Sequence, residues 1–96
     1  TLLFHCDVVY VGESLRLRLP FVALGLVPEA ASSVMLPALI GPRRAAELLF
    51  TAEWIDAGRA LDLGIATRVY ADGEVLDAAL AKAREIARFA VGALQA

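Results

Sequence analysis

A single carboxylate stands out among the residues that could do chemistry. Residues 19–42 carry one ionisable side chain, Glu29, together with all four prolines of the chain. One interpretation is a first-turn glutamate of a helix that begins near Ala30, where it would satisfy free N–H groups and favour the helix dipole. The other is a carboxylate in an apolar pocket, where desolvation makes it the stronger base that acid–base catalysis needs. The residues alone leave both open.

The other reactive side chains give weaker signals. His5 and Cys6 are neighbours, so a strand would face them in opposite directions, and core packing is expected for both. Ser32 and Ser33 have no histidine nearby and fit the start of a helix better than a nucleophile. One cysteine and one histidine leave no material for a Cys-rich or multi-histidine metal site.

Length and composition predict at most one domain, which buries surface against something else. The chain has 96 residues, of which 59% are apolar, and its net charge is −2. This charge gives no reason to expect nucleic acid as a partner. The prolines and Glu29 argue against a membrane-spanning helix within residues 19–42, which we expect to be buried and rich in loops. Because the chain opens on Thr1 without a methionine or a signal-peptide pattern, we expect a segment of a longer polypeptide.

Hydrophobic periodicity and turn residues predict the order of the elements. Two strands come first, short helices follow, and a further strand precedes a long helix that packs on the core. The expected strands are 8–11, 15–19 and 65–70, and the expected helices are 30–40, 42–50, 57–63 and 75–90. This order suits a layered α/β structure.

Several segments in order resemble the crotonase superfamily, the enoyl-CoA hydratases and isomerases. The resemblance runs from Thr1 to about Ala90. Its motifs are His5-Cys6-Asp7-Val8-Val9-Tyr10, Leu19-Pro20-Phe21, Leu24-Gly25-Leu26-Val27-Pro28-Glu29-Ala30-Ala31-Ser32-Ser33, Arg44-Ala45-Ala46-Glu47-Leu48-Leu49-Phe50-Thr51, Ile55-Asp56-Ala57, and Leu63-Gly64-Ile65.

The resemblance implies a spiral of strand–strand–helix units, of which residues 1–96 are a partial core domain from the middle-to-late part. It implies an acyl-CoA thioester as substrate, with coenzyme A part of that substrate and no separate cofactor. It also implies assembly as trimers or hexamers. The family holds the thioester enolate with two backbone N–H groups, and both belong to segments that would precede Thr1. We therefore expect the 96 residues alone to be inactive.

The family's catalytic positions can be carried over one at a time. Family hydratases have a glutamate where this chain has Thr1, and a second one where Phe21 follows Pro20. Thr1 and Phe21 are therefore expected to contact the substrate, but neither side chain supplies a catalytic acid. An isomerase branch that resembles the peroxisomal 3-enoyl-CoA isomerases carries its single acid where this chain has Glu29, although that branch often has glycine at the position of Ala31.

The resemblance thus implies an isomerase that shifts the double bond of a 3-enoyl-CoA to the 2-enoyl position, with Glu29 as acid and base. Two alternatives stay open: a hydratase or other crotonase-type enzyme, and a non-catalytic assembly subunit. A cytoplasmic, bacterial location is expected from the preference for arginine and alanine.

Overall fold

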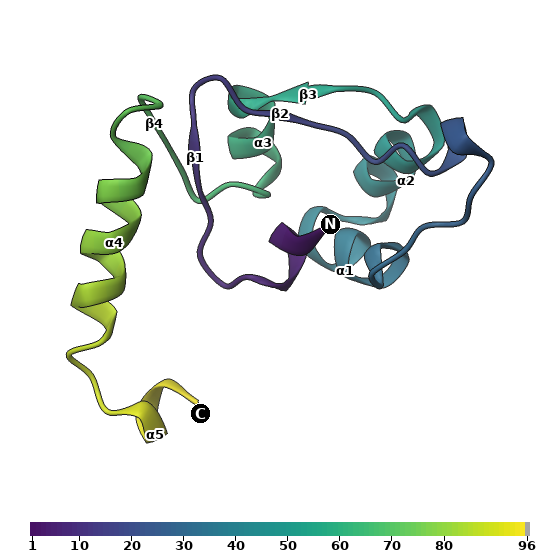
Figure 1. The fold of residues 1–96 in the computed structure, drawn as a ribbon. Coiled ribbons are helices and arrows are strands. Elements are labelled where there is room, and N and C mark those ends of the chain that lie inside the picture. Colours follow the sequence, from purple (N-terminus) through teal and green to yellow (C-terminus); the bar gives the residue numbers. More distant parts are fainter. Residues whose placement is uncertain (96) are drawn as a thin grey trace.

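The computed structural model describes residues 1–95, which form two small sheets and a set of short helices (Figure 1). Strands β1 (Tyr10–Gly12) and β4 (Arg68–Tyr70) pair in parallel, with Val11 opposite Val69. Strands β2 (Arg16–Leu17) and β3 (Ile55–Asp56) pair antiparallel. Residues 13–67, more than half of the chain, connect these two parallel strands. A parallel pair needs such a long crossover connection, which usually contains helices. The expected mixed α/β class is confirmed.

The helices largely follow the expected ranges. They are the 3₁₀ helices η1 (Leu2–His5) and η2 (Val22–Leu24) and the α-helices α1 (Ser32–Ile40), α2 (Pro42–Thr51), α3 (Ala57–Leu63), α4 (Val75–Ile86) and α5 (Val91–Leu94). The Asp56 carboxylate accepts a 2.8 Å hydrogen bond from the Arg59 amide at the start of α3. Gly64 ends that helix with φ 84°, a conformation that glycine adopts without strain. Helix α3 therefore has the bounds that its cap residues predict.

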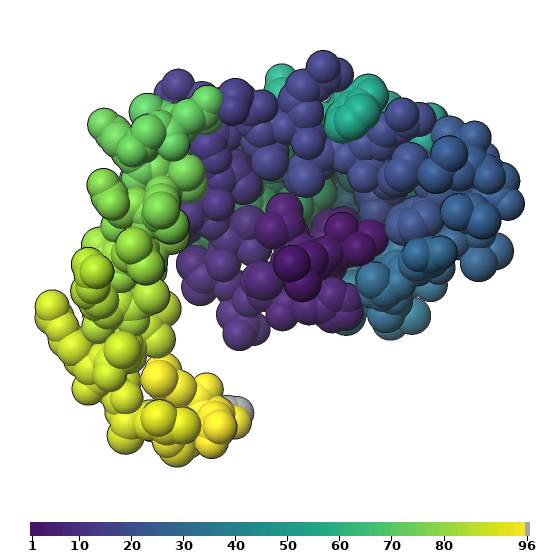
Figure 2. All heavy atoms as spheres, in the orientation of Figure 1, coloured from purple at the N-terminus to yellow at the C-terminus, as the bar shows by residue number. Residues whose placement is uncertain are grey.

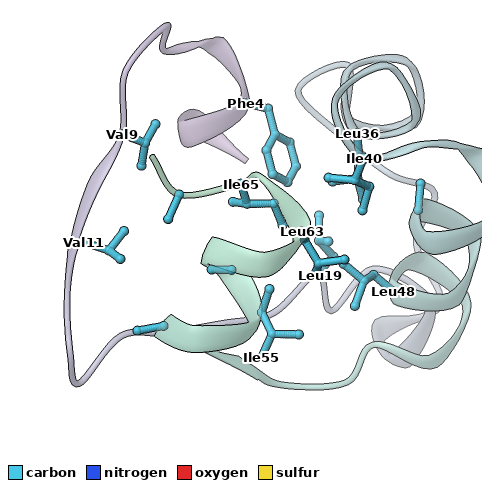
Figure 3. Close-up of a cluster of buried hydrophobic side chains, with 14 residues drawn as sticks. Phe4, Val9, Val11, Leu19, Leu36, Ile40, Leu48, Ile55, Leu63 and Ile65 are labelled. Carbon is cyan, nitrogen blue, oxygen red and sulfur yellow. The ribbon is translucent and has the colours of Figure 1, made fainter. Parts of the chain in front are cut away.

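The core lies where η1, α1, α2 and α3 meet. Figure 3 shows Phe4, Leu36, Leu48 and Leu63 converging there from these four elements. Leu36 is fully buried and Leu48 is 2% exposed. Burying such a side chain contributes about 1.5–3 kcal/mol to folding. The short helices thus stabilise each other through one shared apolar cluster.

Helix α4 departs from the expected core-packing role. It contains no buried residue, and its apolar residues Leu76, Leu80 and Ile86 are exposed. Figure 2 shows α4 and α5 as an arm that extends from the body along one side. The helical pattern predicted the amphipathic helix itself, but residues 1–95 supply few side chains to cover its apolar face. The chain also leaves α4 at Ile86, earlier than the expected Ala90.

The turn between β1 and β2 is held by a carboxylate from the far end of β4. The Ser14 amide donates a 3.0 Å hydrogen bond to Asp72 Oδ1. Hydrogen bonds from Ser14 lower the pKa of the Asp72 carboxyl below its ordinary value.

No helix within residues 1–95 has the length and apolarity needed to cross a membrane.

This lowered pKa predicts a dependence of stability on pH. Because the Asp72 pKa is lower in the folded than in the unfolded chain, the stabilisation is present at neutral pH and is lost as the pH falls through the carboxyl's titration range. Asp72→Asn keeps an acceptor oxygen and cannot titrate. Urea unfolding between about pH 6 and pH 3 should show a shallower loss of stability in this variant. Parallel pH profiles for the two proteins would contradict the role of this bond.

Candidate functional site

Glu29 lies in an exposed connection between η2 and α1. Among residues 22–31 only Pro28 is partly buried, and the others are exposed. The connection ends in two successive residues with left-handed backbone conformation, Ala30 (φ 52°) and Ala31 (φ 56°). Such a conformation is costly for residues other than glycine. This turn explains why α1 begins at Ser32 and not at the expected Ala30.

The expectation that Glu29 lies in an apolar pocket is wrong for this chain. The side chain is exposed, and it lines none of the three cavities that lie beside Phe4, Tyr10 and Thr67. The reason is the connection itself, since a segment whose side chains point outward cannot enclose a carboxylate. The expected burial of residues 19–42 fails for the same part of the chain, although Leu19, Leu36 and Ile40 do lie in the core.

Exposed apolar side chains nevertheless lie on both sides of Glu29 in the sequence. Leu26 is 51% exposed, Val27 79% and Val34 69%. Together with Val22 and Leu24, which are also exposed, they form what we call the apolar rim of Glu29. Exposed apolar surface of this kind is typical of a site that binds a ligand or another protein surface. The carboxylate is thus the one charged side chain within an apolar surface segment.

Thr1 lines a small cavity within the core. A small cavity of about 20 Å³ is lined by Thr1 together with Leu3, Phe4, Leu17, Arg18, Leu19, Leu48, Glu53, Ile55 and Ile65. It has room for about one water molecule, which is too little for an acyl chain. Its lining includes neither Phe21 nor Glu29. The structure therefore does not bring the three predicted site residues together in one cavity.

Phe21 is partly buried and packs against the core cluster. Its carbonyl accepts a 2.8 Å hydrogen bond from the Leu26 amide, which closes the turn around η2. This turn brings the chain from the end of β2 towards the apolar rim. A phenyl group can neither accept nor donate a proton in catalysis, so Phe21 contributes apolar surface only.

The residue that sequence reasoning missed is His5. It is exposed, contrary to the expected core packing, and its ring Nε2 lies 2.8 Å from the Ala30 carbonyl oxygen. Because a carbonyl only accepts, Nε2 must carry the proton. The contact joins η1 to the residue that follows Glu29 across 25 positions of sequence. Neither the adjacency to Cys6 nor any local pattern could have indicated it.

Ser32 and Ser33 begin α1 as expected, but neither side chain caps the helix. Ser32 is fully buried, and its Oγ has no hydrogen-bond partner within residues 1–95. No group of three or more His, Cys, Asp or Glu side chains in that part of the chain could hold a metal ion.

Comparison with known proteins identifies the family of the chain. The profile of the family described as enoyl-CoA hydratase/isomerase matches residues 1–96. The 2,3-dehydroadipyl-CoA hydratase of Escherichia coli is 35% identical over 91 residues, which are 95% of this chain and 36% of that protein. Enoyl-CoA delta isomerase 2 of Homo sapiens is 36% identical over 72 residues, which are 75% of this chain and 18% of that protein.

Solved structures give the same result for the fold. The crystal structure of an enoyl-CoA hydratase/isomerase from Pseudoalteromonas atlantica superposes with a TM-score of 0.91 at 42% identity. The superposition covers 95% of this chain and 37% of that one. The chain therefore spans about a third of the length of these two bacterial relatives. Its architecture is a partial crotonase fold, and the chain belongs to the enoyl-CoA hydratase/isomerase family.

Proposed function

We propose that the polypeptide carrying this chain isomerises a 3-enoyl-CoA to the 2-enoyl-CoA, with Glu29 as its acid and base. The observation that carries the proposal is the distribution of carboxylates. By the family resemblance, Thr1 and Phe21 stand at the two positions where family hydratases hold an acid, and Glu29 stands at the position of the isomerase acid. Hydration requires one group to activate water and another to manage the proton, and neither Thr1 nor Phe21 can do this.

The proposed reaction needs only one carboxylate. Glu29 removes a proton from carbon 2 of the thioester, and the electron pair moves into the thioester to give a dienolate. The protonated Glu29 then returns this proton to carbon 4, and the double bond moves from between carbons 3 and 4 to between carbons 2 and 3. Substrate and product have the same atoms, so no water and no redox cofactor enters the reaction. Coenzyme A takes part only as the thioester portion of the substrate.

The apolar rim supports this assignment. An acyl chain that lies along Leu26, Val27 and Val34 would remove these side chains from water and place its reacting carbons beside Glu29. Covering the carboxylate in this way would also exclude the water that a hydratase needs. The exposure of Glu29 in this chain is consistent with a site that is completed by the bound substrate and by further protein surface.

The proposal also covers the substrate class, the oligomeric assembly and the cellular location. An acyl-CoA thioester is the substrate class, and a homotrimer or homohexamer is the proposed assembly. The exposed apolar residues of α4 and α5, among them Leu76, Phe89 and Val91, offer surface for such an assembly. A cytoplasmic location is proposed because bacterial enzymes are among the relatives.

Product analysis tests the reaction. The polypeptide carrying this chain should convert a 3-enoyl-CoA into the conjugated 2-enoyl-CoA, and it should not add water to a 2-enoyl-CoA. A 3-hydroxyacyl-CoA product would instead support the hydratase alternative, since a hydratase is among the relatives at 35% identity.

The non-catalytic alternative is favoured by the exposure of Glu29. It predicts neither product and no binding of acyl-CoA. Calorimetric titration of the same polypeptide with an acyl-CoA distinguishes the non-catalytic subunit from both enzymes, because each enzyme must bind the thioester.

A further inference from the structure

Three consecutive carbonyl groups at the Glu29 turn are hydrogen-bonded, two of them by local backbone amides and one by a distant side chain. The Glu29 carbonyl accepts from the Ser32 amide at 3.0 Å, and the Ala31 carbonyl accepts from the amides of the first turn of α1. Between them, the Ala30 carbonyl faces the ring of His5 at 2.8 Å. The first and third bonds are local, whereas the second comes from η1, 25 positions earlier in the sequence.

This middle bond acts where the backbone is least favourable. Ala30 and Ala31 both have positive φ, so the peptide group between them is not held in place by ordinary backbone preference. The hydrogen bond from His5 fixes the direction of the Ala30 carbonyl and with it the plane of this peptide group. Within residues 1–95, the His5 ring is the one hydrogen-bond partner of the Ala30 carbonyl oxygen, because no backbone amide there donates to it.

The direction of the Glu29 side chain depends on the same turn. Its α-carbon is joined directly to Ala30, and its own carbonyl is held by Ser32. If the peptide group after Ala30 rotates, the bond between the Glu29 carbonyl and the Ser32 amide must also change. Proton transfer between two carbons of a substrate requires a carboxylate held within hydrogen-bond reach of both.

We propose that His5 is a positioning residue that holds the Glu29 turn in its reactive conformation by donating a hydrogen bond to the Ala30 carbonyl. The proposal rests on the proposed isomerase function and adds a residue to it. His5 touches no reacting atom in this role. Its effect falls on the turnover of bound substrate, because the acyl-CoA itself makes no contact with His5 in the proposed arrangement.

The experiment compares four variants of the polypeptide carrying this chain, assayed with a 3-enoyl-CoA. His5→Ala removes the donor, and His5→Gln keeps an N–H donor at similar reach. Cys6→Ala is the matched control, because the Cys6 thiol contacts only the Leu2 carbonyl of its own turn. Glu29→Gln tests the proposed function separately. Amide hydrogen exchange at Ser32 reports on the turn without any reference to activity.

We expect His5→Ala to lower kcat by about 3- to 10-fold with KM unchanged, as the net contribution of one hydrogen bond allows. Exchange at Ser32 should quicken by a similar factor. His5→Gln should restore most of kcat and of the protection, and Cys6→Ala should change neither. A merely structural role of His5 would lower the amount of folded protein and leave the kcat of the folded fraction unchanged.

Several results would overturn the proposal while Glu29→Gln is inactive: unchanged kcat in His5→Ala, a change in KM alone, or equal losses in His5→Ala and His5→Gln. If His5→Ala does not fold, His5→Gln decides, since kcat near that of Cys6→Ala supports the proposal and kcat near that of Glu29→Gln overturns it. If Glu29→Gln is fully active, the proposed function fails. Exchange at Ser32 then still shows whether His5 holds the turn.

Discussion

Glu29→Gln should lower the turnover of a 3-enoyl-CoA by about 10²–10⁴-fold, the range that general acid–base catalysis usually contributes. The substitution keeps the size of the side chain and its hydrogen-bonding oxygen but removes the group that accepts and returns the proton. Because Glu29 is exposed, the change should leave the fold intact. The measurement is the rate at which conjugated 2-enoyl-CoA forms, with KM for the 3-enoyl-CoA determined in parallel.

Glu74→Gln is a suitable control for this variant. Glu74 is also exposed and lies at the start of α4, away from the apolar rim. It should retain full turnover. Equal rates in Glu29→Gln and Glu74→Gln would remove Glu29 from the mechanism. A loss in both would indicate a general effect of the negative charge on binding the substrate.

Leu36→Ala should destabilise the chain by about 3 kcal/mol, within the range measured when a buried leucine is truncated. Leu36 is fully buried on α1 and contributes to the cluster that joins η1, α1, α2 and α3. Domains of this size are stable by only about 5–15 kcal/mol, so the loss is a large fraction of the total. Urea unfolding followed by circular dichroism gives the free energy directly.

Leu39→Ala serves as the matched control for Leu36→Ala. Leu39 lies on the same helix and is 44% exposed. The same substitution there has the same effect on helix propensity but leaves no cavity, so a loss of well under 1 kcal/mol is expected. Equal losses at the two positions would contradict the location of the core.

The elements that could be predicted from the sequence are those with local signals. Asp56 and Gly64 mark the ends of α3, and Pro42 opens α2, because capping and proline act within a few residues. The apolar period of residues 75–86 likewise indicates α4. Strand β3 was missed because a strand of two residues is too short to show an alternating hydrophobic pattern. Its pairing with β2 joins segments that are distant in the sequence.

The sequence singles out a candidate residue, Glu29, but it does not predict the surroundings of that residue. Glu29 stands out because the chain around it has no other charge, yet apolar neighbours in sequence did not become a pocket in space. The two left-handed alanines and the outward-facing connection decide this, and both depend on tertiary structure. His5 was assigned to the core because neither η1 nor its contact with the Ala30 carbonyl has a local signal in the sequence.

The most direct test of the account follows one hydrogen from carbon 2 to carbon 4. A 3-enoyl-CoA with deuterium at carbon 2 is incubated in ordinary water with the polypeptide carrying this chain, and mass spectrometry and NMR locate the label in the product. Proton transfer by Glu29 predicts 2-enoyl-CoA with part of the deuterium at carbon 4, and formation of this product should be about 10²–10⁴-fold slower in Glu29→Gln. A hydrated product, or the same labelled product at an undiminished rate from Glu29→Gln, would contradict it.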